Sequence, residues 1–66
     1  MSNTRVIRNE RSHAYTIMHA VGDRKTAGEL EAEGYAFARE HSLGDCTIAA
    51  HHDAIHGDHV HILVKE

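Results

Sequence analysis

The sequence predicts a small α+β domain of two layers, in which a mainly antiparallel sheet carries one helix on one face in the order ββαββ. Three observations lead to this fold class. Segments with alternating apolar and polar residues lie on both sides of residues 26–41, where the apolar spacing becomes that of a helix. Short connections containing Gly, Asp and Asn separate the segments. With 66 residues, the chain is expected to form a single domain over residues 1–66.

Two strands are expected before the helix. Residues 4–8 predict a short edge strand, residues 9–12 a turn, and residues 13–21 a second strand. On that second strand Tyr15, Ile17, His19 and Val21 share one face and Ala14, Thr16, Met18 and Ala20 share the other, because side chains alternate along a strand. We expect the face with Tyr15 and Ile17 to pack against the helix.

The helix has clear start signals. Thr26 is a good N-cap, and Glu29 three residues later completes a capping box. The helix is expected to run to about His41, with Gly44 as the C′ residue. Its apolar stripe consists of Leu30, Gly34, Phe37 and Ala38. Gly34 lies on this stripe, which suggests close approach to the sheet.

A histidine-rich hairpin is predicted at residues 45–65, with strands at 45–53 and 59–65 and a loop at 54–58. We expect Asp53 to pair with His59, which places His51 opposite His61. In this register the apolar face consists of Cys46, Ile48, Ala50, Val60, Ile62 and Val64. The other face gathers His51, Asp53, His59 and His61, with His52 near the rim of the apolar face and His56 in the loop.

This second face predicts a divalent-metal site. Opposed side chains in a strand pair have Cβ atoms about 4.5–5.5 Å apart, so the imidazoles and the carboxylate are close enough to converge on one ion. Three imidazole nitrogens beside a carboxylate suit Zn²⁺, Mn²⁺, Ni²⁺ or Co²⁺. The alternative is a solvated polar face that happens to be rich in histidine.

Charge divides the chain into two parts. The formal net charge is −3, yet residues 1–25 hold five basic residues, whereas residues 26–66 hold eight acidic ones. The helix carries Glu29, Glu31, Glu33 and Glu40, and this acidic face is expected to contact a basic partner surface. It argues against a simple DNA-binding domain.

Other features exclude some classes of protein. No apolar run reaches the length of a membrane span and no signal-peptide pattern opens the chain, so we expect a cytoplasmic protein without a membrane partner. The single cysteine, Cys46, cannot form an intrachain disulfide and is expected to face inward. Bare sheet edges in so short a chain favour pairing with a second copy, as a homodimer.

The histidine segment resembles a known motif. Residues 48–53, followed by 59–64 with the sequence His-Val-His-Ile-Leu-Val, look like the metal-binding hairpin of relaxases, the plasmid mobilisation family of the HUH endonucleases (histidine, hydrophobic residue, histidine). The similarity covers roughly residues 11–65. It implies that His51, His59 and His61 are the metal ligands and that Asp53 orients an imidazole. In relaxases the ion polarises the scissile phosphate of single-stranded DNA while a tyrosine attacks it.

The chain departs from the family at the nucleophile. Relaxases carry their tyrosine near the N-terminus, and here no tyrosine precedes Tyr15, while Tyr35 belongs to the helix. We therefore expect a truncated relaxase-like module of a mobile element that binds single-stranded DNA or joins a nicking complex, without nicking DNA alone. The alternative is a small acidic protein of a phage or plasmid. It would inhibit a host defence complex by covering its basic nucleic-acid-binding surface, as an anti-CRISPR protein does.

Overall fold

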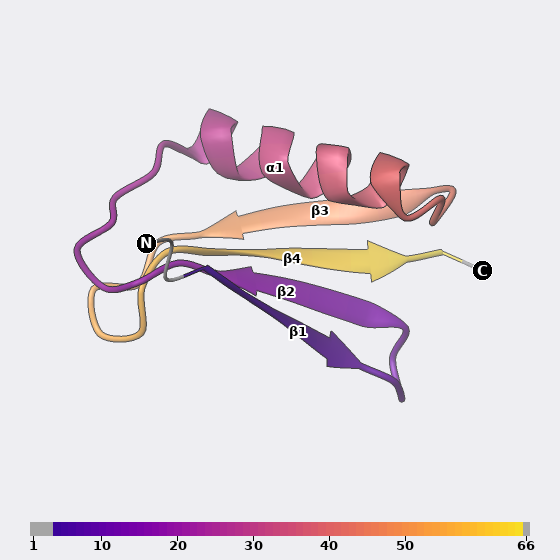
Figure 1. The fold of residues 1–66 in the computed structure, drawn as a ribbon, viewed down its shortest axis with the longest axis horizontal. Coiled ribbons are helices and arrows are strands. Elements are labelled where there is room, and N and C mark those ends of the chain that lie inside the picture. The colour runs from indigo at the N-terminus through magenta and orange to yellow at the C-terminus, as the bar shows by residue number, and fades with distance from the viewer. Residues whose placement is uncertain (1–3, 66) are drawn as a thin grey trace.

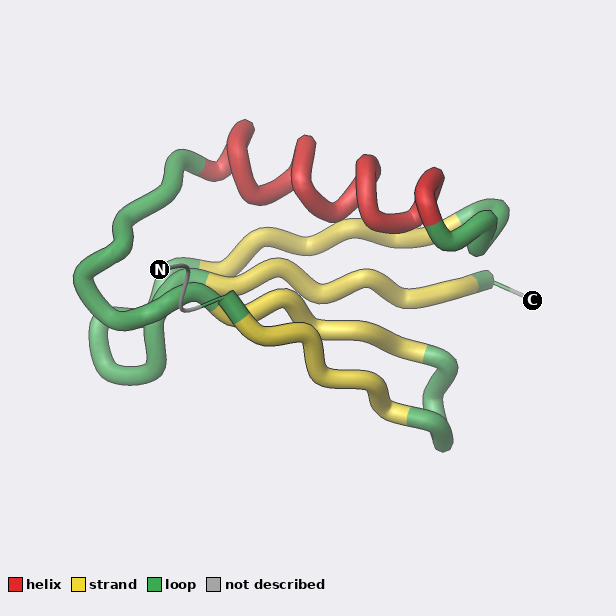
Figure 2. Tube along the Cα trace, viewed as in Figure 1, coloured by secondary structure: helices red, strands yellow, loops and turns green. Residues whose placement is uncertain are grey.

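The computed structural model describes residues 4–65. Its elements, in chain order, are β1 (Arg5–Asn9), β2 (Ala14–Met18), α1 (Ala27–Glu40), β3 (Cys46–His51) and β4 (His59–Val64). The strands form one antiparallel sheet in the order β1-β2-β4-β3, and α1 lies on one face of it (Figures 1 and 2). The predicted two-layer ββαββ fold is confirmed.

The core lies between α1 and the strands β2, β4 and β3. Its buried cluster consists of Ile17, Leu30, Val60 and Ile62, with Tyr15, Phe37, Leu43, Cys46, Ile48 and Ala50 packed around it. The predicted apolar face of the hairpin and the predicted stripe of the helix therefore meet. Gly34 is the point of closest approach, because a Cβ built there would lie 2.8 Å from Ile48 Cγ2 and 3.1 Å from Val60 Cγ2.

Both ends of α1 are capped. The Thr26 hydroxyl accepts a hydrogen bond from the Glu29 amide at 3.1 Å, and the Glu29 carboxylate accepts one from the Thr26 amide at 3.0 Å, so the predicted capping box is confirmed. At the C-terminus the prediction of Gly44 as C′ is wrong. Ser42 takes the left-handed conformation there, with φ 52°, and the Leu43 amide donates to the Ala38 carbonyl at 3.0 Å.

The predicted hairpin register is wrong by two residues. His51 pairs with His59, and Ala49 rather than His51 lies opposite His61. The cause is Asp53, which leaves the strand: its Oδ1 accepts from the amides of Ile55 and His56, and its carbonyl accepts from the Gly57 amide. A shift of two residues keeps every side chain on its predicted face, because side chains alternate with period two.

The loop between β3 and β4 is held against the end of β2. The His19 amide donates to the Asp58 carbonyl at 2.9 Å. The His19 side chain is buried, and its Nε2 lies 2.6 Å from Glu33 Oε1 on α1. His19 therefore connects the loop to the helix and fixes where the hairpin ends.

Candidate metal centre on the open face of the sheet

The face of the sheet opposite α1 has no helix over it in the described part of the chain. Its side chains form three rows across the strands β1, β2, β4 and β3, as the pairing defines them. The first row is Arg5, Met18, His59 and His51; the second is Ile7, Thr16, His61 and Ala49; the third is Asn9, Ala14, Leu63 and Thr47. Three histidines of the hairpin, His51, His59 and His61, therefore lie together at the β4–β3 side of this open face.

The three predicted ligands, His51, His59 and His61, are brought into one cluster. The ring centre of His51 lies 5.2 Å from that of His59 and 4.9 Å from that of His61, and the His59 and His61 centres are 4.9 Å apart. Nitrogen ligands bind a tetrahedral ion at about 2.0–2.1 Å, which places the centres of three imidazoles about 5 Å apart. The spacing of the cluster therefore matches that of a three-histidine site.

Neighbouring groups hold two of the rings by their Nδ1 atoms. His59 Nδ1 donates to the Gly57 carbonyl at 3.1 Å, which leaves Nε2 with its lone pair when the ring is neutral. His61 Nδ1 lies 2.9 Å from the Thr16 hydroxyl. When this hydroxyl accepts the hydrogen bond from Nδ1, the lone pair of His61 Nε2 is left free to bind an ion. A second hydrogen bond of this kind is how metal-binding histidines are usually oriented.

Clustering also affects protonation. Burial lowers the pKa of His61 below its usual 6.5, and the neighbouring rings of His59 and His51 lower it further. Both effects disfavour a charged ring.

The three rings are gathered without being fully arranged around an ion. Among residues 4–65, no three His, Cys, Asp or Glu side chains form a group that could hold a metal as they stand. The ring of His51 is stacked on that of His59 with 14° between their planes. Since His51 is exposed and rotation about the Cβ–Cγ bond of histidine is soft, we expect binding to turn this ring toward the other two. The donor set itself, three imidazoles, fits Zn²⁺, Ni²⁺, Co²⁺ or Mn²⁺.

Asp53, predicted to orient a ligand, instead holds a histidine of the loop. Its Oδ2 lies 3.0 Å from His56 Nδ1. The hydrogen bond from the His56 side chain, followed by those from the amides of His56 and Ile55, lowers the pKa of Asp53 to about 2. The groups that contact the Nδ1 atoms of His61 and His59 are the Thr16 hydroxyl and the Gly57 carbonyl, not Asp53. Thr16 could be found only from the pairing of β2 with β4, which no local pattern predicts.

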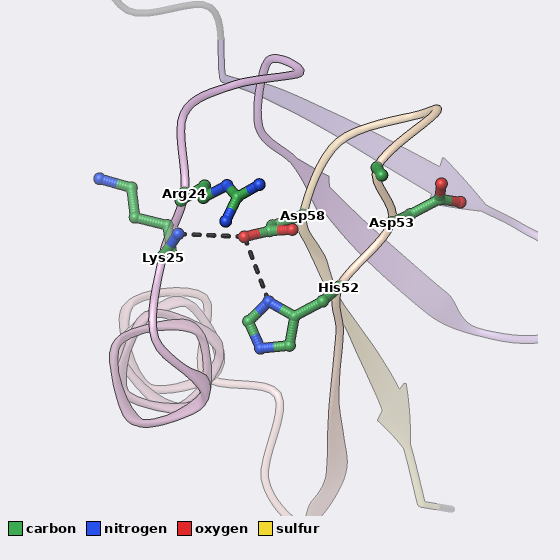
Figure 3. A pocket seen from close by; sticks show the side chains of 6 residues that line it. Arg24, Lys25, His52, Asp53 and Asp58 are labelled. Carbon is green, nitrogen blue, oxygen red and sulfur yellow. Dashed lines mark hydrogen bonds and ion pairs between the residues drawn. The ribbon is translucent and has the colours of Figure 1, made fainter.

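A pocket of about 420 Å³ lies between the β2–α1 and β3–β4 loops (Figure 3). It is lined by Arg24, Lys25, His52, Asp53, Ala54 and Asp58. Asp58 ties the two loops together, since its Oδ2 accepts from the Lys25 amide at 3.0 Å and lies 3.2 Å from His52 Nδ1. These hydrogen bonds lower the pKa of Asp58, that from the Lys25 amide most.

The four glutamates of the predicted acidic face of α1 differ in their contacts. Glu29 belongs to the capping box, and Glu33 binds His19 and lines a groove beside the helix together with Glu40. Glu31 is exposed. The hydrogen bonds to the Thr26 backbone and side chain lower the pKa of Glu29.

Both tyrosines lie on the helix side of the molecule, away from the three histidines. The Tyr15 ring lies 5.1 Å from that of Phe37, and Tyr35 is exposed on α1. The sheet separates both hydroxyls from the open face.

Comparison with known proteins gave no match among family models, curated proteins or solved structures. The relation to relaxases therefore stays a prediction based on the histidine motif. Within residues 4–65, no helix has both the length and the apolar character needed to cross a membrane.

Proposed function

We propose that this chain is a metal-binding module of the HUH type that acts on nucleic acid without supplying the nucleophile. The single observation that supports this most strongly is the cluster of His51, His59 and His61, with ring centres 4.9–5.2 Å apart on a sheet face that α1 leaves open. Hydrogen bonds at Nδ1 orient two of the three rings, those of His59 and His61, as is usual for metal-binding histidines.

In this proposal each residue has a defined task. His51, His59 and His61 hold the ion through ring nitrogens, while the Gly57 carbonyl and the Thr16 hydroxyl fix the rings of His59 and His61. A divalent ion held there supplies Lewis-acid polarisation of a phosphodiester. Arg5 lies in the same row as His59 and His51, two strands from His59 and three from His51, and its guanidinium adds positive charge to the face that a phosphate would approach.

The chain's own tyrosines do not complete a nicking reaction. Tyr15 packs on Phe37 and Tyr35 belongs to the helix layer, so neither reaches a phosphate on the open face. We therefore propose binding and positioning of single-stranded DNA, alone or within a nicking complex whose tyrosine comes from another polypeptide.

Calorimetric titration with Zn²⁺ and with Mn²⁺ tests the metal site. We expect one ion per chain for the wild type and no binding for His59→Ala/His61→Ala. The matched control is His52→Ala/His56→Ala, which removes two loop histidines outside the cluster and should retain binding. Affinity should fall as the pH drops below about 6.5, because protons compete for the imidazoles. Equal loss in both double variants, or an affinity that is flat from pH 5 to 8, would refute the site.

Fluorescence anisotropy with a labelled single-stranded oligonucleotide tests the nucleic-acid part. We expect metal-dependent binding that weakens as salt is raised, because phosphate contacts release counterions. Metal binding without any DNA binding would contradict the nucleic-acid part of the proposal and show that the metal site has another role.

A second candidate is the inhibitor of a host nucleic-acid-binding complex. The eight acidic residues of segment 26–66, set against Arg39 and Lys65, favour it. This candidate predicts that the wild type binds neither Zn²⁺ nor single-stranded DNA, and that Glu31→Lys/Glu40→Lys abolishes inhibition of the target complex.

A further inference from the structure

On the sheet face where it lies, α1 covers mainly the half formed by β3 and β4. α1 packs on β3 and β4, whereas β1 is paired with β2 at the other edge and all five of its residues are exposed. Figures 1 and 2 show α1 running alongside β3, with β2 and β1 extending away from it. Between α1 and β1 lies a groove of about 240 Å³, lined by Thr4, by Val6 and Ile17 of the sheet, and by Glu33, Ala36, Phe37 and Glu40 of α1.

Beside α1 this face has room for one more helix, which would lie over the exposed edge strand β1, since Ile17 of β2 is already buried. Neighbouring strands lie about 4.7–4.9 Å apart, so the β1–β2 pair is centred about 9–10 Å from the β4–β3 pair beneath α1. Helices that pack side by side have axes 8–10 Å apart. A helix lying over β1 and β2 would therefore touch the sheet and α1 at the same time.

The residues that line the groove have the pattern of a helix–helix contact. Glu33, Ala36, Phe37 and Glu40 have the spacing i, i+3, i+4 and i+7, which places them on one side of α1. Ala36 and Phe37 are the apolar centre of this stripe. Glu33 and Glu40 mark its ends, two helical turns or about 10 Å apart. Glu33 binds His19 through Oε1, and its side chain is still 36 % exposed.

The floor of the groove is apolar and accessible. Val6 is 52 % exposed, although it pairs with the buried core residue Ile17 on the same face of the sheet. The buried hydrophobic core of the described chain is small, consisting of Ile17, Leu30, Ala38, Val60 and Ile62. A domain of this size gains stability by covering such a face.

We propose that this groove binds an amphipathic helix of a partner protein. The apolar face of that helix lies on Val6, Ala36 and Phe37, and Lys or Arg residues two turns apart on one flank lie opposite Glu33 and Glu40. The acidic ends of the stripe select a basic helix rather than a neutral or acidic one. This inference is independent of the histidine cluster, which lies on the opposite face of the sheet.

The probe is a synthetic helical peptide of about 18 residues, long enough to have some helicity alone. It carries Leu at i, i+3, i+4 and i+7, Lys seven residues apart on one flank, Gln elsewhere and one Trp. Because the protein has no tryptophan, the Trp emission reports on the peptide alone. A matched peptide has Glu in place of Lys. We expect the Lys peptide to bind and the Glu peptide to bind at least about tenfold more weakly.

Two pairs of protein variants locate the binding surface. Val6→Lys places a charge in the groove, whereas Ile7→Lys places the same charge on the next residue of β1, on the open face. We expect Val6→Lys to weaken binding at least about tenfold and Ile7→Lys to leave it within about twofold of the wild type. Glu40→Gln should weaken binding severalfold, and Glu31→Gln, outside the groove, should not.

Four results would overturn the proposal. Equal binding of the two peptides, or equal loss in Val6→Lys and Ile7→Lys, would show that the groove does not select a basic helix. Amide chemical-shift changes confined to the histidine face would place the peptide elsewhere. Sedimentation showing a dimer that Val6→Lys separates would make the occupant a second copy of this chain.

Discussion

Replacing Gly34 by alanine tests how α1 is seated on the sheet. The added methyl group would lie 2.8 Å from Ile48 Cγ2 and 3.1 Å from Val60 Cγ2, both shorter than ordinary van der Waals contact. Both neighbours are β-branched, so their methyl groups cannot turn away at low cost. The helix must therefore lift or the sheet side chains must shift.

The magnitude follows from two opposing effects. Overpacking a core by one methyl group costs typically about 1–3 kcal/mol in the free energy of unfolding. Alanine in place of glycine inside a helix raises the free energy of unfolding by about 1 kcal/mol. Gly28→Ala has only the second effect, because a Cβ there meets nothing closer than Thr26 Oγ1 at 3.9 Å. Gly28→Ala should stabilise by about 0.5–1 kcal/mol, and Gly34→Ala should be about 1–3 kcal/mol less stable than Gly28→Ala.

Urea unfolding followed by circular dichroism measures this difference. For a domain of this size the slope is about 1 kcal/mol per molar urea, so the midpoints should differ by about 1–3 M. Amide NMR spectra give the folded fraction if Gly34→Ala is partly unfolded in water. If both variants are stabilised to within about 0.5 kcal/mol of each other, α1 does not approach β3 and β4 as closely as described.

Three further predictions concern the caps, the loop and pH. Thr26→Ala should lower the free energy of unfolding by about 1 kcal/mol, because the Glu29 amide loses its acceptor, and Thr26→Ser should restore most of it in the same urea assay. Gly57→Ala should cost more than about 2 kcal/mol, since φ is +95° and the new Cβ would collide with the His19 carbonyl. Its thermal midpoint should therefore fall well below that of Gly22→Ala, where φ is +93° and the space is open. The lowered pKa of His61 means that the folded state binds this proton less tightly than the unfolded state, so metal-free stability should be greatest above pH 6.5 and fall as the pH drops below it. His61→Gln should flatten that decline in chemical denaturation measured from pH 8 to 5, and an unchanged slope would contradict the assignment.

Much of the fold followed from patterns that span only a few residues. The capping box of Thr26 and Glu29 needs residues three apart, and the alternation around His59 and His61 needs residues two apart. Such local patterns correctly placed the three histidines on the face opposite the aliphatic side chains. They did not determine the end of the helix, because Ser42, with φ 52°, is left-handed two residues before Gly44, with φ 74°, and Leu43 between them packs on the core.

The sequence by itself determined which elements form and which side chains share a face, because both depend on interactions between near neighbours in the chain. Only the tertiary structure decided the pairing of His51 with His59, the contact of Thr16 with His61, and the groove between α1 and β1. Each of these joins segments distant in sequence, and each depends on long-range strand order or on hydrogen bonds within a loop. A period-two pattern is unchanged when one strand slides by two residues along its neighbour. The face of each side chain was therefore predictable, whereas the residue paired opposite it was not.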